Sequence, residues 1–273
     1  MIDFSIEFFP PKTPNHESAL WECLNSIKDF NPEFISVTYG ADGSTRDRTH
    51  SIVQNIHENN KITCVPHLTC VNTSKDEISE ILDSYSNMGV KSIVALRGDK
   101  PTTPNLNTSD YAFAYELVTD IKLKNKFQNI YVAAYPEKHP EAKSLTADLN
   151  NLKRKIDCGA TAAITQFFFN NNYYYDFLNK CEQMGIGIPI IPGILPINNF
   201  TRVSAFASKC GASIPKEITK KYESLTMESE CFEPSLDLLI NQVNNLIENQ
   251  IKKIHFYTLN QHKLLVNLFS SIE

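Results

Sequence analysis

Short apolar runs alternate with helical stretches along the whole chain, and this alternation limits the possible folds more than any other feature. Eight of the runs have the length of buried strands: 3–9, 34–39, 62–67, 92–97, 129–135, 162–168, 188–194 and 252–257. Between them, apolar side chains recur at helical spacing. Strict alternation of strands and helices produces a parallel sheet with right-handed crossovers. Eight units predict an α/β fold of the (β/α)8 TIM-barrel class, and the alternative is an open doubly wound sheet.

The connection between the last two predicted strands, residues 198–250, has room for two or three helices. No Pro/Gly/Ser-rich linker flanks it, so we interpret it as extra helices before the last strand rather than a second domain. The chain has 273 residues, of which 42% are hydrophobic. Barrels of this class often form one domain of about 250 residues. We therefore expect a single domain over residues 1–273.

Charge and hydropathy exclude several classes of partner. The net charge is −5 and the pI is about 5.8, so the chain lacks the basic balance of a nucleic-acid-binding protein. Its longest apolar stretch, 188–197, contains three prolines and is shorter than the roughly 18 residues that a transmembrane helix needs. The N-terminus lacks the basic and apolar regions of a signal peptide, and the seven cysteines are an odd number. We expect a cytoplasmic protein with free thiols and no membrane association.

Polar residues occur where the predicted strands end, which is where barrel enzymes carry their chemistry. Glu7 lies within the segment Ser5-Ile6-Glu7-Phe8-Phe9. These apolar neighbours leave the carboxylate poorly solvated, which raises its pKa toward the range of a general acid. The alternative is an ion pair between Glu7 and an arginine or lysine inside the barrel.

Arg97-Gly98-Asp99 ends the fourth predicted strand. Gly98 allows a ligand to approach the backbone closely. Arg97 can bind a phosphate, and Asp99 can accept hydrogen bonds from an N–H-rich ring. The alternative is an Arg97–Asp99 ion pair that caps the strand.

Cys64, His67 and Cys70 are residue types that bind zinc, but the strand register argues against a metal site. Cys64 and Cys70 share strand parity and face one side, whereas His67 faces the other. We therefore predict no metal site here and interpret His67 as a hydrogen-bonding ligand contact at a strand end.

The helix predicted from about residue 144 carries a polar stripe of Asp148, Asn151 and Lys155 beside an apolar one. On spacing alone, an ordinary solvated face is the simpler interpretation. The segment nearest to a dinucleotide fingerprint, Gly185-Ile186-Gly187, has Ile190 in place of the third glycine. There is no Walker A pattern either, so a nucleotide cofactor would have to bind without a Rossmann turn.

Eight short motifs follow one another at or near the predicted strand ends. They are Glu7-Phe8-Phe9-Pro10-Pro11, Ser36-Val37-Thr38-Tyr39-Gly40, Arg46-Asp47-Arg48-Thr49, Pro66-His67-Leu68-Thr69, Ala95-Leu96-Arg97-Gly98-Asp99, Ala134-Tyr135-Pro136-Glu137, Ile164-Thr165-Gln166-Phe167-Phe168-Phe169 and Pro192-Gly193-Ile194-Leu195-Pro196. Each motif is modest alone, but the ordered set resembles the bacterial methylenetetrahydrofolate reductases over nearly the whole chain. Members of that family are flavin-containing (β/α)8 barrels, in agreement with the fold predicted from the alternation.

The resemblance implies an FAD-dependent oxidoreductase. In such an enzyme NAD(P)H, with NADH favoured over NADPH, reduces the flavin and leaves. Then 5,10-methylenetetrahydrofolate takes the same face of the flavin and is reduced to 5-methyltetrahydrofolate. This ping-pong reaction feeds methionine synthesis, and the enzyme is expected to be a homo-oligomer that binds neither nucleic acid nor membrane.

The resemblance also implies roles for single residues. Glu7 resembles the general acid that helps to open the five-membered ring of the folate. Asp99 resembles the residue that contacts the pterin and tunes the flavin, and Gln166 resembles one that serves both folate and nicotinamide. Thr38 corresponds to a contact of the nicotinamide nucleotide, and Phe206 to an aromatic residue that packs on the bound substrate.

The implied FAD contacts fall on strand ends and on the polar stripe, which thereby becomes a cofactor contact. They are Tyr39, Ala41, His67, Arg97, Gly98, Asp99, Ala114, Tyr135, His139, Ala142, Asp148, Asn151, Arg154 and Lys155. The chain departs from the family pattern at Gln261, where a basic residue is common, and at Arg202, where a glutamine is frequent. Both departures concern contacts of the folate tail.

Two other functions remain open from the residues alone. One is a barrel lyase or a pterin-dependent methyltransferase that uses Glu7 and Asp99 without flavin. The other is a folate-binding barrel without enzymatic activity. A reductase that carries FAD is yellow, whereas proteins of the other two kinds are colourless.

Overall fold

The strands form one parallel sheet that curls into a barrel. The computed structural model describes residues 2–11, 13–39, 46–99, 109–225 and 228–272. Within these residues, nine strands pair in the order β7-β6-β5-β4-β3-β2-β1-β9-β8. They are β1 (Asp3–Phe8), β2 (Phe34–Val37), β3 (Cys64–Thr69), β4 (Ser92–Leu96), β5 (Asn129–Ala134), β6 (Ala162–Thr165), β7 (Ile190–Ile191), β8 (Gly193–Ile194) and β9 (Lys253–Tyr257). The predicted TIM-barrel class is confirmed.

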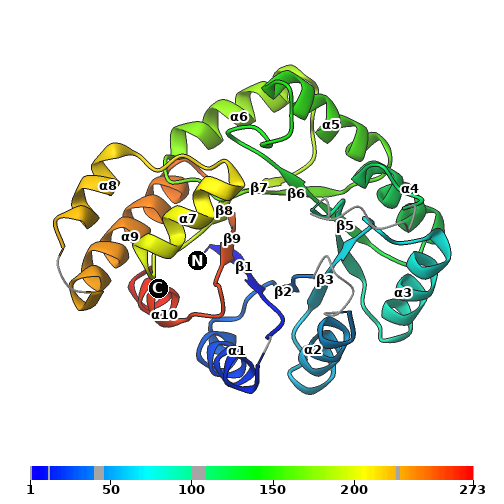
Figure 1. Cartoon of the computed structure of the whole chain (residues 1–273), viewed down its shortest axis with the longest axis horizontal. Coiled ribbons are helices and arrows are strands. Elements are labelled where there is room, and N and C mark those ends of the chain that lie inside the picture. The colour runs from blue at the N-terminus through cyan, green and yellow to red at the C-terminus, as the bar shows by residue number, and fades with distance from the viewer. Residues whose placement is uncertain (1, 12, 40–45, 100–108, 226–227, 273) are drawn as a thin grey trace.

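Helices surround the strands on the outside (Figure 1). They are α1 (Pro14–Ile27), α2 (Arg46–Asn59), α3 (Lys75–Asn87), α4 (Ala114–Lys124), α5 (Leu145–Asp157), α6 (Asn171–Gln183), α7 (Phe200–Cys210), α8 (Lys216–Glu223), α9 (Phe232–Glu248) and α10 (Lys263–Ile272). Local capping fixes where several of them begin. Ser144, for example, accepts a hydrogen bond from the Ala147 N–H at the start of α5. Among the described helices, none has the length and apolar character required to cross a bilayer.

The barrel closes where one predicted strand is split in two. The run 188–194 contains Pro192, which has no N–H to donate, and the strand breaks there into β7 and β8. β7 pairs with β6, and β8 pairs with β9, so the two halves join the ends of the sheet. The next residue, Gly193, packs so tightly that a Cβ atom would collide with the Thr165 carbonyl and the Tyr257 ring. The single continuous strand expected for 188–194 is therefore wrong, although its place in the barrel is right.

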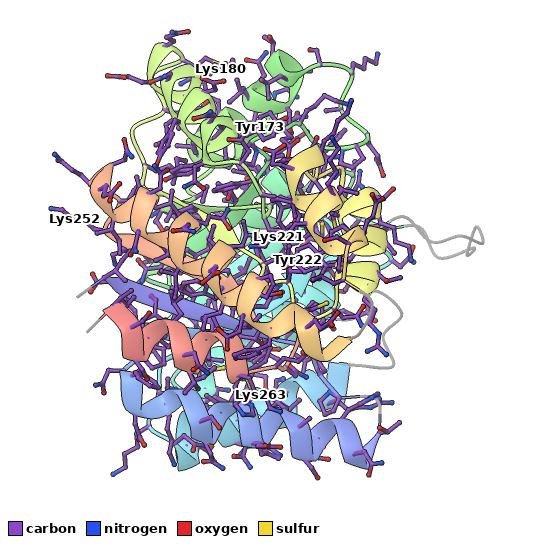
Figure 2. The ribbon with its side chains drawn as sticks, turned by 90° about the vertical axis from the view of Figure 1, so that its left-hand side faces the viewer. Tyr173, Lys180, Lys221, Tyr222, Lys252 and Lys263 are labelled. Carbon is purple, nitrogen blue, oxygen red and sulfur yellow. The ribbon has the colours of Figure 1, made fainter. Side chains whose placement is uncertain are left out.

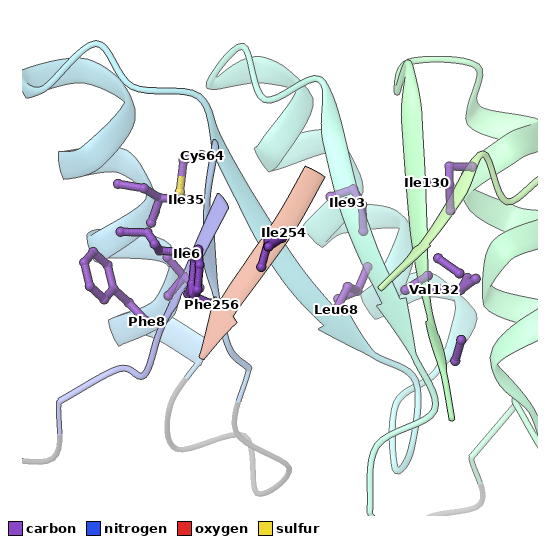
Figure 3. Close-up of a cluster of buried hydrophobic side chains, with 14 of the residues drawn as sticks. Ile6, Phe8, Ile35, Cys64, Leu68, Ile93, Ile130, Val132, Ile254 and Phe256 are labelled. Atoms are coloured by element: carbon purple, nitrogen blue, oxygen red, sulfur yellow. The ribbon is translucent and has the colours of Figure 1, made fainter. Parts of the chain in front are cut away.

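Side chains alternate between an outer apolar layer and the barrel interior. The outer layer packs against the helices and includes the labelled side chains of Figure 3. Three of them, Ile6, Phe8 and Phe256, are fully buried. Residues of opposite parity point inward, and they form a separate small cluster: Phe34, Val65, Val94, Tyr131, Ala162, Ile164 and Ile191. Glu7 and His255 share the inward parity of their strands. The strand period thus places polar groups at the barrel mouth.

The extra helices predicted between the last two strands are present as α7, α8 and α9. They build a third apolar cluster around Phe167, Phe169 and Tyr222, in which the Tyr222 ring stacks on Phe200 with the ring centroids 4.5 Å apart. On this side of the molecule α9 lies between α6 and α10, and the labelled lysines Lys180, Lys252 and Lys263 are at the surface (Figure 2). The insertion therefore covers one flank of the barrel and carries Phe206 to its mouth.

Candidate active site

A cavity of about 290 Å3 opens at the carboxyl ends of the strands. Residues predicted to bind substrate or cofactor, or to catalyse, converge on it from six of the strand ends and from α7. Those that line it are Glu7, Thr38, Tyr39, His67, Gly98, Asp99, Tyr135, Gln166 and Phe206. The predicted strand-end cluster is thus a single concave site, which we call the barrel-mouth cavity.

Glu7 is a buried carboxyl group of this cavity. Its side chain is 6% exposed, and its Oε2 lies 3.3 Å from His67 Nε2 and 3.9 Å from His255 Nε2. Burial raises the pKa of Glu7 to about 7, although a charge on His67 would lower it. Burial also lowers the pKa of His67 to about 4 and that of His255 to about 3, so both rings are neutral at pH 7. A neutral ring stabilises a carboxylate weakly, so desolvation dominates.

The raised pKa expected for Glu7 is confirmed, and the alternative of an internal arginine or lysine partner is wrong. The neighbours of the carboxyl group are two histidines instead. His67 Nε2 approaches Glu7 without the alignment of a hydrogen bond, and among the described residues it has no hydrogen-bond partner. The arrangement holds a carboxyl group whose pKa is raised into the neutral range.

Residues after the last strand position Glu7, and the sequence prediction missed them. The Thr258 hydroxyl donates to the Glu7 carbonyl at 2.6 Å. Asn260 binds both backbone groups of Phe9, each at 2.9 Å. Behind Glu7, the Ser5 hydroxyl and His255 Nδ1 lie 2.7 Å apart. One signal in the sequence could have found them. The last predicted strand ends in polar residues, and closure of the barrel places that strand beside the first strand, which carries Glu7.

A second, larger cavity of about 500 Å3 adjoins the first and shares Gly98, Asp99 and Tyr135 with it. We call it the outer cavity. It gathers most of the predicted FAD contacts: Arg97, Gly98, Asp99, Ala114, Tyr135, His139, Ala142, Asp148, Asn151 and Lys155. Tyr39 and His67 line the barrel-mouth cavity instead. Arg154 is exposed and lines neither cavity, and Ala41 lies outside the described residues.

The polar stripe of α5 forms part of the wall of the outer cavity, although Asn151 is also exposed to solvent. Lys155 Nζ donates to the Ala133 carbonyl at 2.5 Å, and burial lowers its pKa to about 8. Asp148 accepts the His139 N–H at 2.8 Å and fixes the loop before the helix. A half-buried ammonium beside a cavity favours an anionic or electron-rich ligand.

The Arg97-Gly98-Asp99 segment also differs from its simplest interpretation. Arg97 makes a two-point ion pair with Glu141, with both N···O distances 3.0 Å. The predicted alternative of an Arg97–Asp99 pair is therefore wrong. Gly98 has φ +89°, and a Cβ there would lie 2.7 Å from Val71 Cγ1. Only glycine fits this turn, and the backbone is left open toward both cavities.

The remaining predicted substrate residues have defined neighbours. Gln166 Oε1 accepts the Phe167 N–H at 3.1 Å, which leaves the amide NH2 group as a donor at the cavity wall. The Phe206 ring packs on Phe167 with centroids 5.3 Å apart. Cys64 belongs to the outer apolar layer and His67 to the cavity, as the strand parity predicted. In the described part of the chain, no three His, Cys, Asp or Glu side chains are grouped as metal ligands.

Comparison with known proteins identifies relatives along the whole chain. The family model described as methylenetetrahydrofolate reductase matches residues 1–273. A 5,10-methylenetetrahydrofolate reductase of Salmonella typhimurium is 42% identical over 267 residues, which cover 96% of this chain and 88% of the relative. Methylenetetrahydrofolate reductase (NADH) 1 of Zea mays is 33% identical over 283 residues, which cover 98% of this chain and 48% of that protein.

A solved structure shares the fold at low identity. An uncharacterized protein from Clostridium thermocellum, described as binding two copies of 5-methyl-5,6,7,8-tetrahydrofolic acid, superposes with a TM-score of 0.64 and 18% identity. The match covers 99% of this chain and 94% of that one and shows the barrel fold alone. The full-length family match and the identity to the bacterial relatives decide the assignment. The chain belongs to the methylenetetrahydrofolate reductase family.

Proposed function

We propose that this chain reduces 5,10-methylenetetrahydrofolate to 5-methyltetrahydrofolate with electrons from NAD(P)H carried by FAD, in a ping-pong reaction that supplies methionine synthesis. Family membership makes it a methylenetetrahydrofolate reductase, an oxidoreductase. The cofactor, the electron donor and the residue roles are the proposal. The observation that carries it is the buried Glu7 carboxyl, whose pKa of about 7 suits a proton donor, in a cavity next to a larger one.

Three features of the cavities fit a flavin. His67 Nε2 is buried without a hydrogen-bond partner among the described residues, so a ligand group in the cavity would satisfy it. Gly98 lines both cavities, and its φ of +89° holds the backbone there in a conformation that residues with a side chain rarely adopt. Lys155 and Arg97 place cations on the outer cavity, where the phosphates of a dinucleotide would lie. Bound FAD would supply two-electron hydride chemistry, and residues of the two adjoining cavities would hold it.

Folate and nicotinamide would use the barrel-mouth cavity in turn. At about 290 Å3 this cavity is the size of one ring-bearing ligand portion and not of two. The amide NH2 group of Gln166 can donate to either ligand, and Phe206 can pack on either ring. Asp99, at the rim, can accept the N–H groups of a pterin. NADH is the favoured donor because the plant relative is named as NADH-dependent.

Glu7 would supply the proton that only the folate step requires. Opening the five-membered ring of methylenetetrahydrofolate leaves a nitrogen that must be protonated, and the protonated Glu7 carboxyl can donate to it. Ser5, His255 and Thr258 hold the β1 end and its surroundings, so they act as positioning residues. His67 stays neutral and adds no competing charge.

The first test is optical. The purified chain should be yellow, and anaerobic NADH should bleach it, with NADPH as the comparison. Addition of methylenetetrahydrofolate should then restore the colour. A colourless protein that binds folate tightly would instead support a folate-binding barrel, and a colourless protein that turns folate over would support a flavin-free lyase or methyltransferase.

A further inference from the structure

A two-point ion pair crosses the wall of the outer cavity. Arg97 follows β4, and Glu141 lies on the loop between β5 and α5. Arg97 Nη1 binds Glu141 Oε2, and Nη2 binds Oε1, both at 3.0 Å. Both residues line the outer cavity. The edge of the Arg97 guanidinium that carries Nη1 and Nη2, its paired Nη edge, is therefore occupied by the Glu141 carboxylate.

The loop that carries Glu141 is held by its own hydrogen bonds. The Glu141 N–H donates to His139 Nδ1 at 3.0 Å, and the His139 N–H donates to Asp148 Oδ2 at 2.8 Å. The Ala142 N–H donates to the His139 carbonyl at 2.9 Å. The backbone that carries Glu141 is thus fixed by the fold, and the exposed side chain of Glu141 reaches Arg97 from this fixed position.

The charge around the outer cavity disfavours an anion as long as this pair is closed. Its described lining residues carry two cations, Arg97 and Lys155, and three carboxylates, Asp99, Glu141 and Asp148. A phosphate group binds arginine through the same two-point geometry that Glu141 uses. A phosphate and the Glu141 carboxylate therefore cannot both occupy the paired Nη edge of Arg97.

We propose that Glu141 is a stand-in anion, which occupies the edge of Arg97 that a phosphate group of a nucleotide ligand takes and which that ligand displaces on binding. The inference deepens the proposed function, because it rests on the assignment of FAD to the outer cavity. Both side chains are partly exposed, at 24% and 42%, and ion pairs of this kind are weak enough to exchange. Glu141 would thus set how tightly the cofactor is held, and its charge would oppose binding.

Calorimetric titration of ADP into the full chain, freed of flavin by dialysis, tests the inference. ADP carries the phosphates and takes no part in redox chemistry. Glu141→Gln keeps the shape and removes the charge, and it should bind ADP about three- to tenfold more tightly than the wild type. Glu137→Gln is the matched control, since Glu137 is on the same loop but accepts the Ser213 N–H, at 3.0 and 3.1 Å, and does not line the outer cavity. It should leave ADP affinity unchanged.

A double-mutant cycle separates displacement from a general charge effect. In an Arg97→Gln background, which should bind ADP at least tenfold more weakly, Glu141→Gln should no longer tighten binding. Equal or weaker binding by a folded Glu141→Gln protein, or equal tightening with and without Arg97, would overturn the inference while leaving the flavin assignment intact. A wild-type chain that binds neither ADP nor FAD would overturn both.

Discussion

Glu7 owes its proton affinity to burial and not to a charged partner. The two histidines nearest to it are themselves buried and have lowered pKa values, so no cation stabilises the carboxylate at pH 7. In such surroundings a carboxyl group keeps its proton near neutral pH. The residue is therefore prepared for donation before any substrate arrives.

Glu7→Gln should change stability in a pH-dependent way. The folded-state pKa of about 7 lies above the ordinary value of 4.5, so between these values the folded protein holds a proton that the unfolded chain has lost. The contribution of Glu7 to the free energy of unfolding of the wild type therefore falls by about 3 kcal/mol as the pH rises from 4.5 to about 7. Above that range the contribution no longer changes with pH. The neutral amide avoids this loss.

Urea unfolding at pH 5 and pH 8 measures the difference between the two proteins. The free energy of unfolding of Glu7→Gln, relative to that of the wild type, should be higher at pH 8 than at pH 5. Glu182→Gln, at an exposed carboxylate on α6, is the control and should show no such gain. A Glu7→Gln effect that is the same at both pH values would mean that the carboxyl is not desolvated.

Some of this site could be predicted from single residues, and some could not. The apolar neighbours of Glu7 are adjacent in sequence, so its raised pKa was predictable. Its contacts with His67 and His255 depend on which strands become neighbours when the barrel closes. Likewise, the partner of Arg97 is Glu141, from the next strand's loop, and no local rule selects it over Asp99.

At the scale of elements, α5 shows what helical spacing leaves undecided. The stripe of Asp148, Asn151 and Lys155 was visible in the sequence, but a polar stripe can face solvent or a polar cavity equally well. The structure places the stripe on the outer cavity, with Lys155 half-buried and Arg154 exposed. The packing of α5 against the rest of the barrel decides which of the two the stripe faces, and the spacing of residues along the helix carries no information about that packing.

Lys155→Met should weaken FAD binding by at least about tenfold. The substitution roughly preserves volume and removes a cation that stands beside the proposed phosphate or ribose position. Burial already opposes the charge of Lys155, so the folded state should tolerate methionine. Flavin fluorescence released on dilution measures the affinity. Lys153→Met on the same helix, outside both cavities, is the control, and equal affinity of the two variants would remove Lys155 from the cofactor site.

The β7–β8 junction has the shortest Cβ contact of the described glycines, at Gly193, and Gly193→Ala should disrupt it. The new methyl group would collide with the Thr165 carbonyl oxygen and the Tyr257 ring, at a cost of at least about 2 kcal/mol of stability. Gly187→Ala is the matched control, because nothing lies within 4 Å of its Cβ position. Urea unfolding followed by circular dichroism compares them. Equal stability of the two variants would contradict the close packing at the junction.

For the whole molecule, closure of the barrel converts a linear series of strand ends into one site. β1 pairs with β9, which brings the first and the last strand together at Glu7. The number of β/α units predicted the barrel, because each unit is signalled locally. The two adjoining cavities were not predictable, since their walls come from side chains whose packing is set only when all strands are in place.

The proposed ping-pong reaction requires that Glu7 serve one half-reaction only, the reduction of the folate. Stopped-flow measurement of Glu7→Gln, with flavin reduction by NADH and flavin reoxidation by methylenetetrahydrofolate recorded separately, tests this most directly. Hydride transfer from nicotinamide needs no proton from Glu7, so that rate should stay within about tenfold of wild type, whereas the folate step should fall by roughly 10²- to 10⁴-fold. Equal loss in both steps would show that Glu7 only holds the site together, and no loss in either would show that another residue is the acid.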